Sequence, residues 1–186
     1  ILVGALDVDN DITITNGDLD QDQNNANIVV GGDWVMGASG SLDSGADLET
    51  VTFDGGDQSI SGTTTFNNLT KSETTNDSAD VTLTVAAGTT QTINGTLNLN
   101  GLDSNDQINL VSSVPGSYFT FDVTGGNQNV TQLSVRDSHA SSNDILATFS
   151  TSISGNDDTD TPPTDQWIFA STYYWVGSAG GNTNSS

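Results

Sequence analysis

The sequence predicts an all-β chain folded as a parallel β-helix (a β-solenoid), and three features lead to this expectation. Apolar residues alternate strictly with polar ones in short runs, as at Val81, Leu83 and Val85, which is typical of strands with one buried face. Glycines such as Gly88 and Gly95 separate these runs, where they adopt corner conformations without steric cost. Similar runs recur every 32 to 38 residues, and periods of about 20–50 residues are typical of solenoids and other repeat folds.

The recurrence is carried by an apolar residue that mostly stands two positions after a glutamine. Successive apolar positions are 32, 33, 37 and 38 residues apart, so the sequence predicts coils of about 32–38 residues in which these positions stack. A two-layer β-sandwich is the alternative fold, because short strands and glycine turns suit it too, but a sandwich has no reason to repeat at this period. The segments are Ala26-Asn27-Ile28, Gln58-Ser59-Ile60, Gln91-Thr92-Ile93, Gln128-Asn129-Val130 and Gln166-Trp167-Ile168.

The same alternation places short strands along the whole chain. We expect them at residues 12–14, 28–30, 34–36, 50–54, 63–69, 81–85, around 93, 97–99, 108–111, 118–123, 133–135 and 145–149, with polar loops at 71–80 and 154–165. One β-solenoid domain then spans residues 1–177, and a Gly-, Ser- and Asn-rich tail or linker follows at 178–186. The expected core comprises Ile28, Val51, Phe53, Ile60, Leu83, Val85, Ile93, Leu97, Leu99, Phe121, Val123 and Val130.

Composition narrows the classes of function. The 186 residues carry 24 acidic side chains against two basic ones, Lys71 and Arg136, for a formal net charge of −22. Such a chain repels nucleic acids and anionic membranes, so we expect neither as a partner. Cysteine is absent, which excludes disulfides and thiolate chemistry, and no apolar run reaches the roughly 18 residues of a spanning helix. We interpret the chain as a mature or excised piece of a secreted protein.

Several segments resemble a known group of proteins. TVTFDGGDQSISGTTTFNNLT at residues 50–70, TLNLNG at 96–101 and DQWIF at 165–169 are similar to β-helical repeats of large bacterial surface proteins. These include adhesins, autotransporter-type exoproteins and filamentous haemagglutinin-like proteins. The resemblance covers roughly residues 26–177, and it implies a right-handed parallel β-helix, export, and a structural or adhesive role without catalytic residues.

Two acidic clusters are candidates for binding calcium. Alternate aspartates on an extended segment project their carboxylates from one face, and calcium takes about six to eight oxygen ligands. A solvated acidic face that keeps a fibre soluble, or adaptation to high salt, explains the same pattern without a metal, and no EF-hand motif is present. We predict no required cofactor and one candidate ion, Ca²⁺, with the ligands Asp7, Asp9, Asp11, Asp18, Asp20 and Asp22.

No motif predicts an enzyme. Asp137, Ser138 and His139 include the residue types of a catalytic triad, but neighbours on a strand point to opposite faces and cannot act on one another. The alternative function is a carbohydrate- or ice-binding adhesin module. Two residue groups suggest it, although both also serve as ordinary strand and end-packing residues: the threonine pairs 13/15, 63/65, 82/84 and 90/92, and the aromatic residues Trp34, Trp167, Tyr173, Tyr174 and Trp175.

Both ends of the sequence are apolar and strand-like, which suggests assembly. A solenoid leaves unpaired backbone groups on its outermost coils, so these must be capped or joined. We expect residues 1–6 to act as an inter-subunit strand in a head-to-tail polymer, with the joining of repeats within one long polypeptide as the alternative. The assembly residues are Ile1, Leu2, Val3 and Leu6 at one end and Tyr173, Tyr174, Trp175 and Val176 at the other.

These expectations define the predicted function. We expect a non-catalytic structural protein of an extracellular filament, stalk or adhesin, secreted to or displayed on a bacterial cell surface. Its expected partners are further copies of itself and, in the alternative function, surface glycans.

Overall fold

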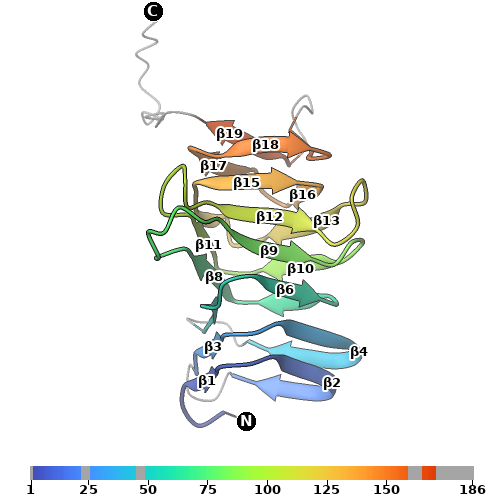
Figure 1. Ribbon diagram of the computed structural model, residues 1–186. Helices are drawn as coiled ribbons and strands as arrows, with labels where there is room; N and C mark the ends of the chain where they lie inside the picture. The colour runs from blue at the N-terminus through green and yellow to red at the C-terminus, as the bar shows by residue number, and fades with distance from the viewer. Residues whose placement is uncertain (1, 22–25, 45–48, 159–164, 171–186) are drawn as a thin grey trace, which may run out of the picture.

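The computed structural model describes residues 2–21, 26–44, 49–158 and 165–170, and the regular elements in these residues are all β-strands. The strands stack in chain order, with β1 at one end of the molecule and β19 at the other (Figure 1). They form three sheets, and neighbouring strands in each sheet run parallel. β-Sandwiches are antiparallel, so this pairing excludes the sandwich alternative.

Each sheet takes its strands from successive passes of the chain. The eight-stranded sheet contains, in spatial order, β1 (Leu6–Val8), β3 (Ile28–Val30), β5 (Thr50–Phe53), β8 (Asn68–Ser72), β11 (Thr96–Asn100), β14 (Asn127–Thr131), β17 (Ile145–Thr148) and β19 (Trp167–Ala170). The seven-stranded sheet contains β2 (Ile12–Asp20), β4 (Trp34–Asp43), β6 (Gln58–Ser61), β9 (Val81–Val85), β12 (Ile108–Ser112), β15 (Leu133–Arg136) and β18 (Thr151–Ser154). The four-stranded sheet contains β7 (Thr64–Phe66), β10 (Thr90–Ile93), β13 (Phe119–Val123) and β16 (Ser138–Ser141).

The central segment, residues 80–101, shows how one pass is built. β9 lies in the seven-stranded sheet, β10 in the four-stranded sheet and β11 in the eight-stranded sheet. Gly88 makes the first corner with a φ of +73°, a conformation that favours glycine. Gly95 makes the second corner, where a Cβ atom would lie 2.5 Å from Oδ1 of Asn68. The strand, corner, strand, corner, strand order predicted from the sequence is therefore confirmed here.

The apolar core lies between the sheets and runs the length of the stack. Strands alternate buried and less buried residues, as β11 does with Leu97 and Leu99 inside. All twelve predicted core residues are buried, which confirms that set. Trp34 also lies inside, fully buried, with its ring centroid 5.6 Å from that of Phe66 and 6.5 Å from that of Phe53.

The predicted coil length of 32–38 residues is wrong. Register partners on adjacent strands are separated by as few as 17 residues, between Val130 and Ala147, and by as many as 31, between Leu97 and Gln128. The recurring apolar positions therefore do not stack as one row. They lie in different sheets: Ile28, Val130 and Ile168 in the eight-stranded, Ile60 in the seven-stranded and Ile93 in the four-stranded sheet. Ile168 is 37% exposed rather than buried.

Two copies of the glutamine motif make the same kind of hydrogen bond, although they lie in different sheets. Gln58 and Gln91 are both buried at strand starts, and each donates its side-chain amide to carbonyls of the previous pass. Gln58 Nε2 bonds to the carbonyls of Val30 and Gly32, at 2.9 and 2.7 Å. Gln91 Nε2 bonds to the carbonyl of Gly62 at 2.8 Å. In these two copies the motif places an inward glutamine at a corner, and the two corners belong to different sheets. Gln128 differs, because it is not fully buried and donates to the Asp144 carbonyl of the following pass at 2.6 Å.

Candidate functional site

An aspartate directly precedes four successive strands of the seven-stranded sheet, β2, β4, β6 and β9. Oδ1 of each aspartate accepts a hydrogen bond from a backbone N–H of the next pass. Such an N–H needs an acceptor at the corner, and a carboxylate is a stronger acceptor than a neutral carbonyl. The pairs are Asp11 with Asp33 N (2.8 Å), Asp33 with Ser59 N (2.6 Å), Asp57 with Thr82 N (2.7 Å) and Asp80 with Gln107 N (2.8 Å). We call these four residues the corner aspartates.

The eight-stranded sheet uses the same device with both amides and carboxylates. Asn27 Oδ1 accepts from Thr50 N at 2.9 Å, and Asn68 Oδ1 accepts from Thr96 N at 2.8 Å. Further along the stack, Oδ1 of Asp144, the residue before β17, accepts from the backbone N–H of the residue before β19 at 3.1 Å. Short oxygen-bearing side chains at strand starts thus tie each pass to the next.

The predicted calcium ligands are placed in separate parts of the first pass. Asp7 lies in β1, Asp9 and Asp11 lie in the turn before β2, and Asp18 and Asp20 lie in β2. Within the described residues, no three Asp, Glu or His side chains are grouped so that they could hold a metal ion. One of them, Asp11, is a corner aspartate, and Asp18 Oδ1 accepts a hydrogen bond from the Ser41 hydroxyl.

The sixth candidate ligand, Asp22, lies outside the described residues. Calcium binding at residues 7–22 therefore stays a prediction from the sequence.

The one lysine of the chain is buried, although the sequence placed it in a polar loop. β8 continues to Ser72, and Lys71 faces inward on this strand with no exposed surface. Its Nζ donates to the carbonyl oxygens of Gly55 and Gly56, both at 2.9 Å, and to Oε1 of Gln58 at 2.8 Å. Desolvation by burial lowers the pKa of Lys71 from 10.5 to about 8, against the opposing attraction of Glu73 and nearby aspartates. Lys71 thus stabilises the turn between β5 and β6.

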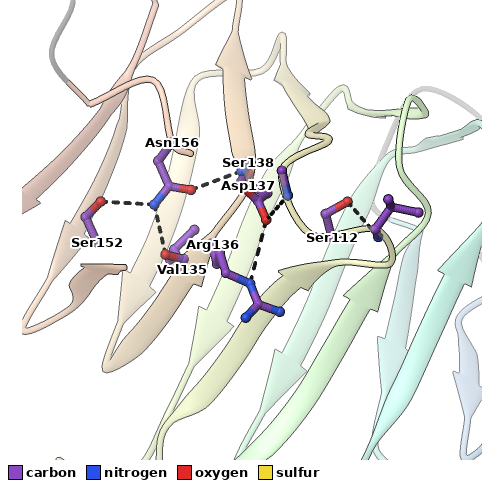
Figure 2. Close-up of polar contacts among 9 residues, drawn as sticks. Ser112, Val135, Arg136, Asp137, Ser138, Ser152 and Asn156 are labelled. Carbon is purple, nitrogen blue, oxygen red and sulfur yellow. Dashed lines mark hydrogen bonds and ion pairs between the residues drawn. The ribbon is translucent and has the colours of Figure 1, made fainter. Parts of the chain in front are cut away.

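The corner between β15 and β16 is held by two side chains from neighbouring passes (Figure 2). Asn156 donates to the Val135 carbonyl at 2.8 Å and to the Ser152 hydroxyl at 3.0 Å, and its Oδ1 accepts from Ser138 N at 3.0 Å. Asp137 has a φ of +56°, and its Oδ2 accepts from Gly116 N at 3.0 Å and lies 3.7 Å from Nε of Arg136. Both side chains therefore hold the corner together.

Ser138 and His139, which include two residue types of a catalytic triad, do not contact one another through their side chains in this structure. Ser138 is fully buried, and its hydroxyl accepts a 3.1 Å hydrogen bond from the indole of Trp167. His139 lies on the other face of β16 and stacks on Tyr118, with ring centroids 3.6 Å apart. The hydroxyl and the imidazole therefore face opposite sides of one strand.

Among the described carboxylates, Asp157 is the one whose pKa is clearly raised by its surroundings. Its Oδ2 accepts from Ala140 N at 2.8 Å, whereas its buried Oδ1 has no hydrogen-bond partner among the described residues. Desolvation raises the pKa of Asp157 from 3.8 to about 6, and the hydrogen bond from Ala140 and the charge of His139 offset part of this rise. One carboxyl of this corner consequently takes up a proton well above its usual range.

The aromatic and threonine residues predicted to bind sugar or ice form only part of the exposed surfaces that such binding requires. Trp34 and Trp167 are 0% and 1% exposed, so neither is available to a ligand, which corrects the prediction for these two residues. Thr65 and Thr92 are register partners, but the next residue in that row is Asp122. The threonine row is therefore short, and Tyr173, Tyr174 and Trp175 lie outside the described residues.

Three of the eight predicted assembly residues can be placed. Leu2 packs on the core and donates its N–H to the Asp20 carbonyl at 2.8 Å, and Val3 is 84% exposed. Leu6 begins β1 and packs on the core. Ile1 and Val176 lie outside the described residues together with the aromatic residues 173–175, as do the proposed boundary at 177 and the tail.

The corner aspartates follow a sequence pattern of their own, which differs from the 32–38-residue recurrence of the glutamine motif. An aspartate stands immediately before an apolar-alternating run at positions 11, 33, 57 and 80, with spacings of 22, 24 and 23 residues. These spacings match the strand-to-strand offsets of the seven-stranded sheet much better than the glutamine motif does. Of these four aspartates, only Asp11 has a role predicted from the sequence, as a candidate calcium ligand, whereas the hydrogen bonds place all four at corners.

Comparisons with known proteins give no likeness that would name a function. No helix in the described part of the chain is long and apolar enough to cross a membrane. No family model matches the chain, and no curated protein or solved structure with which it was compared is similar to it. The resemblance to bacterial surface proteins thus stays a prediction from the sequence.

Proposed function

We propose that this chain is a β-solenoid module with a structural role in an extracellular filament, stalk or adhesin of a bacterial cell surface. The observation that carries the proposal is the stacking of three parallel sheets, in chain order, around one continuous apolar core. In such a stack each pass contacts only its neighbours, so length can be added pass by pass without a new core. A rod of this kind suits a spacer or a fibre segment.

The role is non-catalytic in this proposal, because the chemically capable groups serve the fold. The corner aspartates accept backbone N–H groups, and Lys71 is occupied by two carbonyls and an amide oxygen. Ser138 is buried against Trp167. The high acidity favours an extracellular, soluble rod that repels nucleic acids and anionic surfaces.

Strand addition at β1 is the assembly route that we propose. Leu6 donates its N–H to the Asn27 carbonyl, and the Val8 carbonyl accepts from Gly31 N, so both residues bond toward β3. In a parallel pair the intervening residue, Asp7, points its N–H and C=O away from that neighbour. β1 is the outermost strand of its sheet among the described residues, and we propose that a strand from another copy pairs with it.

Substitution of Asp7 tests the route while leaving the β1–β3 bonds in place. Asp7→Pro removes the outward N–H, together with one carboxylate, and spares the inward bonds of Leu6 and Val8. The matched variant Leu6→Pro removes an inward bond and should lower the melting temperature instead. Electron microscopy of the wild type should show rods that lengthen with protein concentration, and Asp7→Pro should leave short rods with an unchanged far-ultraviolet β signal. Fibres of equal length in both proteins would contradict assembly through β1. Wild-type rods that stay short at every concentration would contradict polymerisation.

A further inference from the structure

The outer face of the four-stranded sheet carries a tyrosine held flat by a histidine. Tyr118 directly precedes β13 and is 51% exposed. Its ring centroid lies 3.6 Å from that of His139, with the two planes only 6° apart. Tyr118 and Thr120 are two residues apart and share a face, and Thr120 is the register partner of His139. The stack fixes the orientation of an exposed aromatic ring, which would otherwise rotate freely.

A surface hollow of about 450 Å³ lies beside this ring. Gly88 and Gly116 contribute corners with φ of +73° and +82°, and no heavy atom lies within 4 Å of the point where either Cβ would be. Two glycines without side chains therefore border the hollow, and the space above their backbone is open. It is lined by Gly88, Thr89, Thr90, Gly116, Ser117, Tyr118 and Thr120.

The position of His139 decides which face of the tyrosine is available. The histidine covers one ring face of Tyr118 and does not line the hollow, so the opposite ring face is the one left for a ligand to stack on. β13 lies between β16 and β10, so Thr90, the register partner of Thr120 on β10, lies on the opposite side of β13 from His139. A flat ligand in the hollow would thus rest on Tyr118 from the β10 side.

The lining chemistry specifies the class of ligand. It combines one aromatic face with hydroxyls of Thr90, Ser117 and Thr120 and contains no ionisable carboxylate or amine. The hydroxyl of Thr89 is already used, because it donates to the Ala86 carbonyl at 2.7 Å. An aromatic face packs against apolar C–H groups, whereas hydroxyls both donate and accept hydrogen bonds. A pyranose ring offers both surfaces, and 450 Å³ is within the usual range of about 300–1,000 Å³ for small-molecule sites.

We propose that this hollow binds a neutral saccharide, with the C–H face of one pyranose ring on Tyr118 and its hydroxyls on Thr90, Ser117 and Thr120. The net charge of −22 selects against anionic sugars, because their carboxylates are repelled. This glycan site adds a binding function to the structural role, and it does not depend on polymerisation.

Heteronuclear NMR of the intact chain tests the site with the methyl glycosides of glucose, galactose, mannose and N-acetylglucosamine as probes. At least one of them should shift the backbone amides of Gly88, Gly116 and Tyr118. Tyr118→Ala should weaken that binding about tenfold or more, since it removes the stacking face, and Tyr118→Phe should retain it. Val114→Ala is the matched control, because Val114 is 50% exposed on the same turn and does not line the hollow.

Each result of these experiments either supports or refutes the saccharide site. Glucuronic acid should bind at least about tenfold more weakly than the glycoside that binds best, because its carboxylate faces an acidic protein. The site would be refuted if none of the four glycosides shifted these amides, or if Tyr118→Ala bound as tightly as Val114→Ala. Amide spectra of each variant report its fold directly, and filament length, measured separately, bears only on the structural role.

Discussion

Oδ1 of Asp57 accepts a 2.7 Å hydrogen bond from the backbone N–H of Thr82, which lies 25 residues later and one pass further along the stack. The two residues occupy matching register positions, since Gln58 pairs with Leu83. A carboxylate outside the strand therefore extends the ladder by one bond, at the point where backbone carbonyls no longer face the next pass. The same relationship recurs at Asp11, Asp33 and Asp80.

Removing one corner aspartate should weaken the stack. Asp57→Ala leaves Thr82 N without its acceptor and should lower the free energy of unfolding by about 1 kcal/mol, as for loss of a helix cap. Asp57→Asn keeps an oxygen acceptor and should retain most of the stability. Asp9→Ala removes the same charge from an exposed residue for comparison. Urea unfolding measures all three, and equal losses for Asp57→Ala and Asp9→Ala would argue against the capping role.

A charge in the core should be far more damaging than a charge outside it. Ile93 is fully buried, so Ile93→Asp places an unpaired carboxylate in the core and should cost several kcal/mol, on the order of 3–5. Thr92 is a poor control, because its register partner on β13 is Asp122 and two carboxylates would repel. Thr65, exposed on β7, is the better one: Thr65→Asp should change the melting temperature little. Similar losses in both variants would contradict the inward assignment of Ile93.

Substitution of the buried lysine should destabilise the chain. Lys71→Met fits the space but removes the donor from two glycine carbonyls and Gln58 Oε1, so the free energy of unfolding should fall by about 2–3 kcal/mol. Chemical unfolding at pH 7 measures this loss. An unchanged unfolding midpoint would mean that water satisfies these acceptors instead.

Lys71 should also give the protein a distinct alkaline pH dependence. Its pKa is about 8 in the folded chain and 10.5 when unperturbed, so between these values the unfolded chain binds more protons. The cost of burying the charged ammonium group, which partly offsets its hydrogen bonds, is therefore constant below pH 8 and disappears as the pH rises to 10.5. The stability gap between wild type and Lys71→Met should widen by up to about 3 kcal/mol over this range. A gap that narrowed, or stayed constant, would contradict the lowered pKa.

Asp157 should make the stability depend on pH in the acidic range, and here stability should fall as the pH rises. Its folded pKa of about 6 lies above 3.8, so the folded chain binds more protons between these values, and its contribution to stability is full below pH 3.8 and lost as the pH rises through 6. Asp157→Asn keeps an acceptor for Ala140 N without the charge. The variant should therefore melt higher than wild type at pH 7 and equally at pH 3.5. A lower melting temperature at pH 7 would show that the ionised carboxylate is needed.

Much of the local structure follows from sequence alone. The alternation at Val81, Leu83 and Val85 identifies both the strand and its buried face, because successive side chains on any strand point to opposite sides. Gly88 likewise indicates the corner, since its positive φ is a local property of the backbone. These signals depend on residues within a few positions of each other.

The tertiary structure decides which passes are neighbours and what the polar residues do. The sequence determined that Ile60 and Ile93 are buried, but only the parallel pairing shows that they belong to different sheets. Register depends on corner lengths and on hydrogen bonds between residues some 17 to 31 positions apart, which no local pattern encodes.

The roles of the polar residues also depend on the tertiary structure. Lys71 looks like a loop residue until β5 and β6 bring their turn carbonyls around its ammonium group. Asp57 looks like solvated charge until the next pass brings Thr82 within 2.7 Å, because an oxygen's role depends on the donor that folding places beside it.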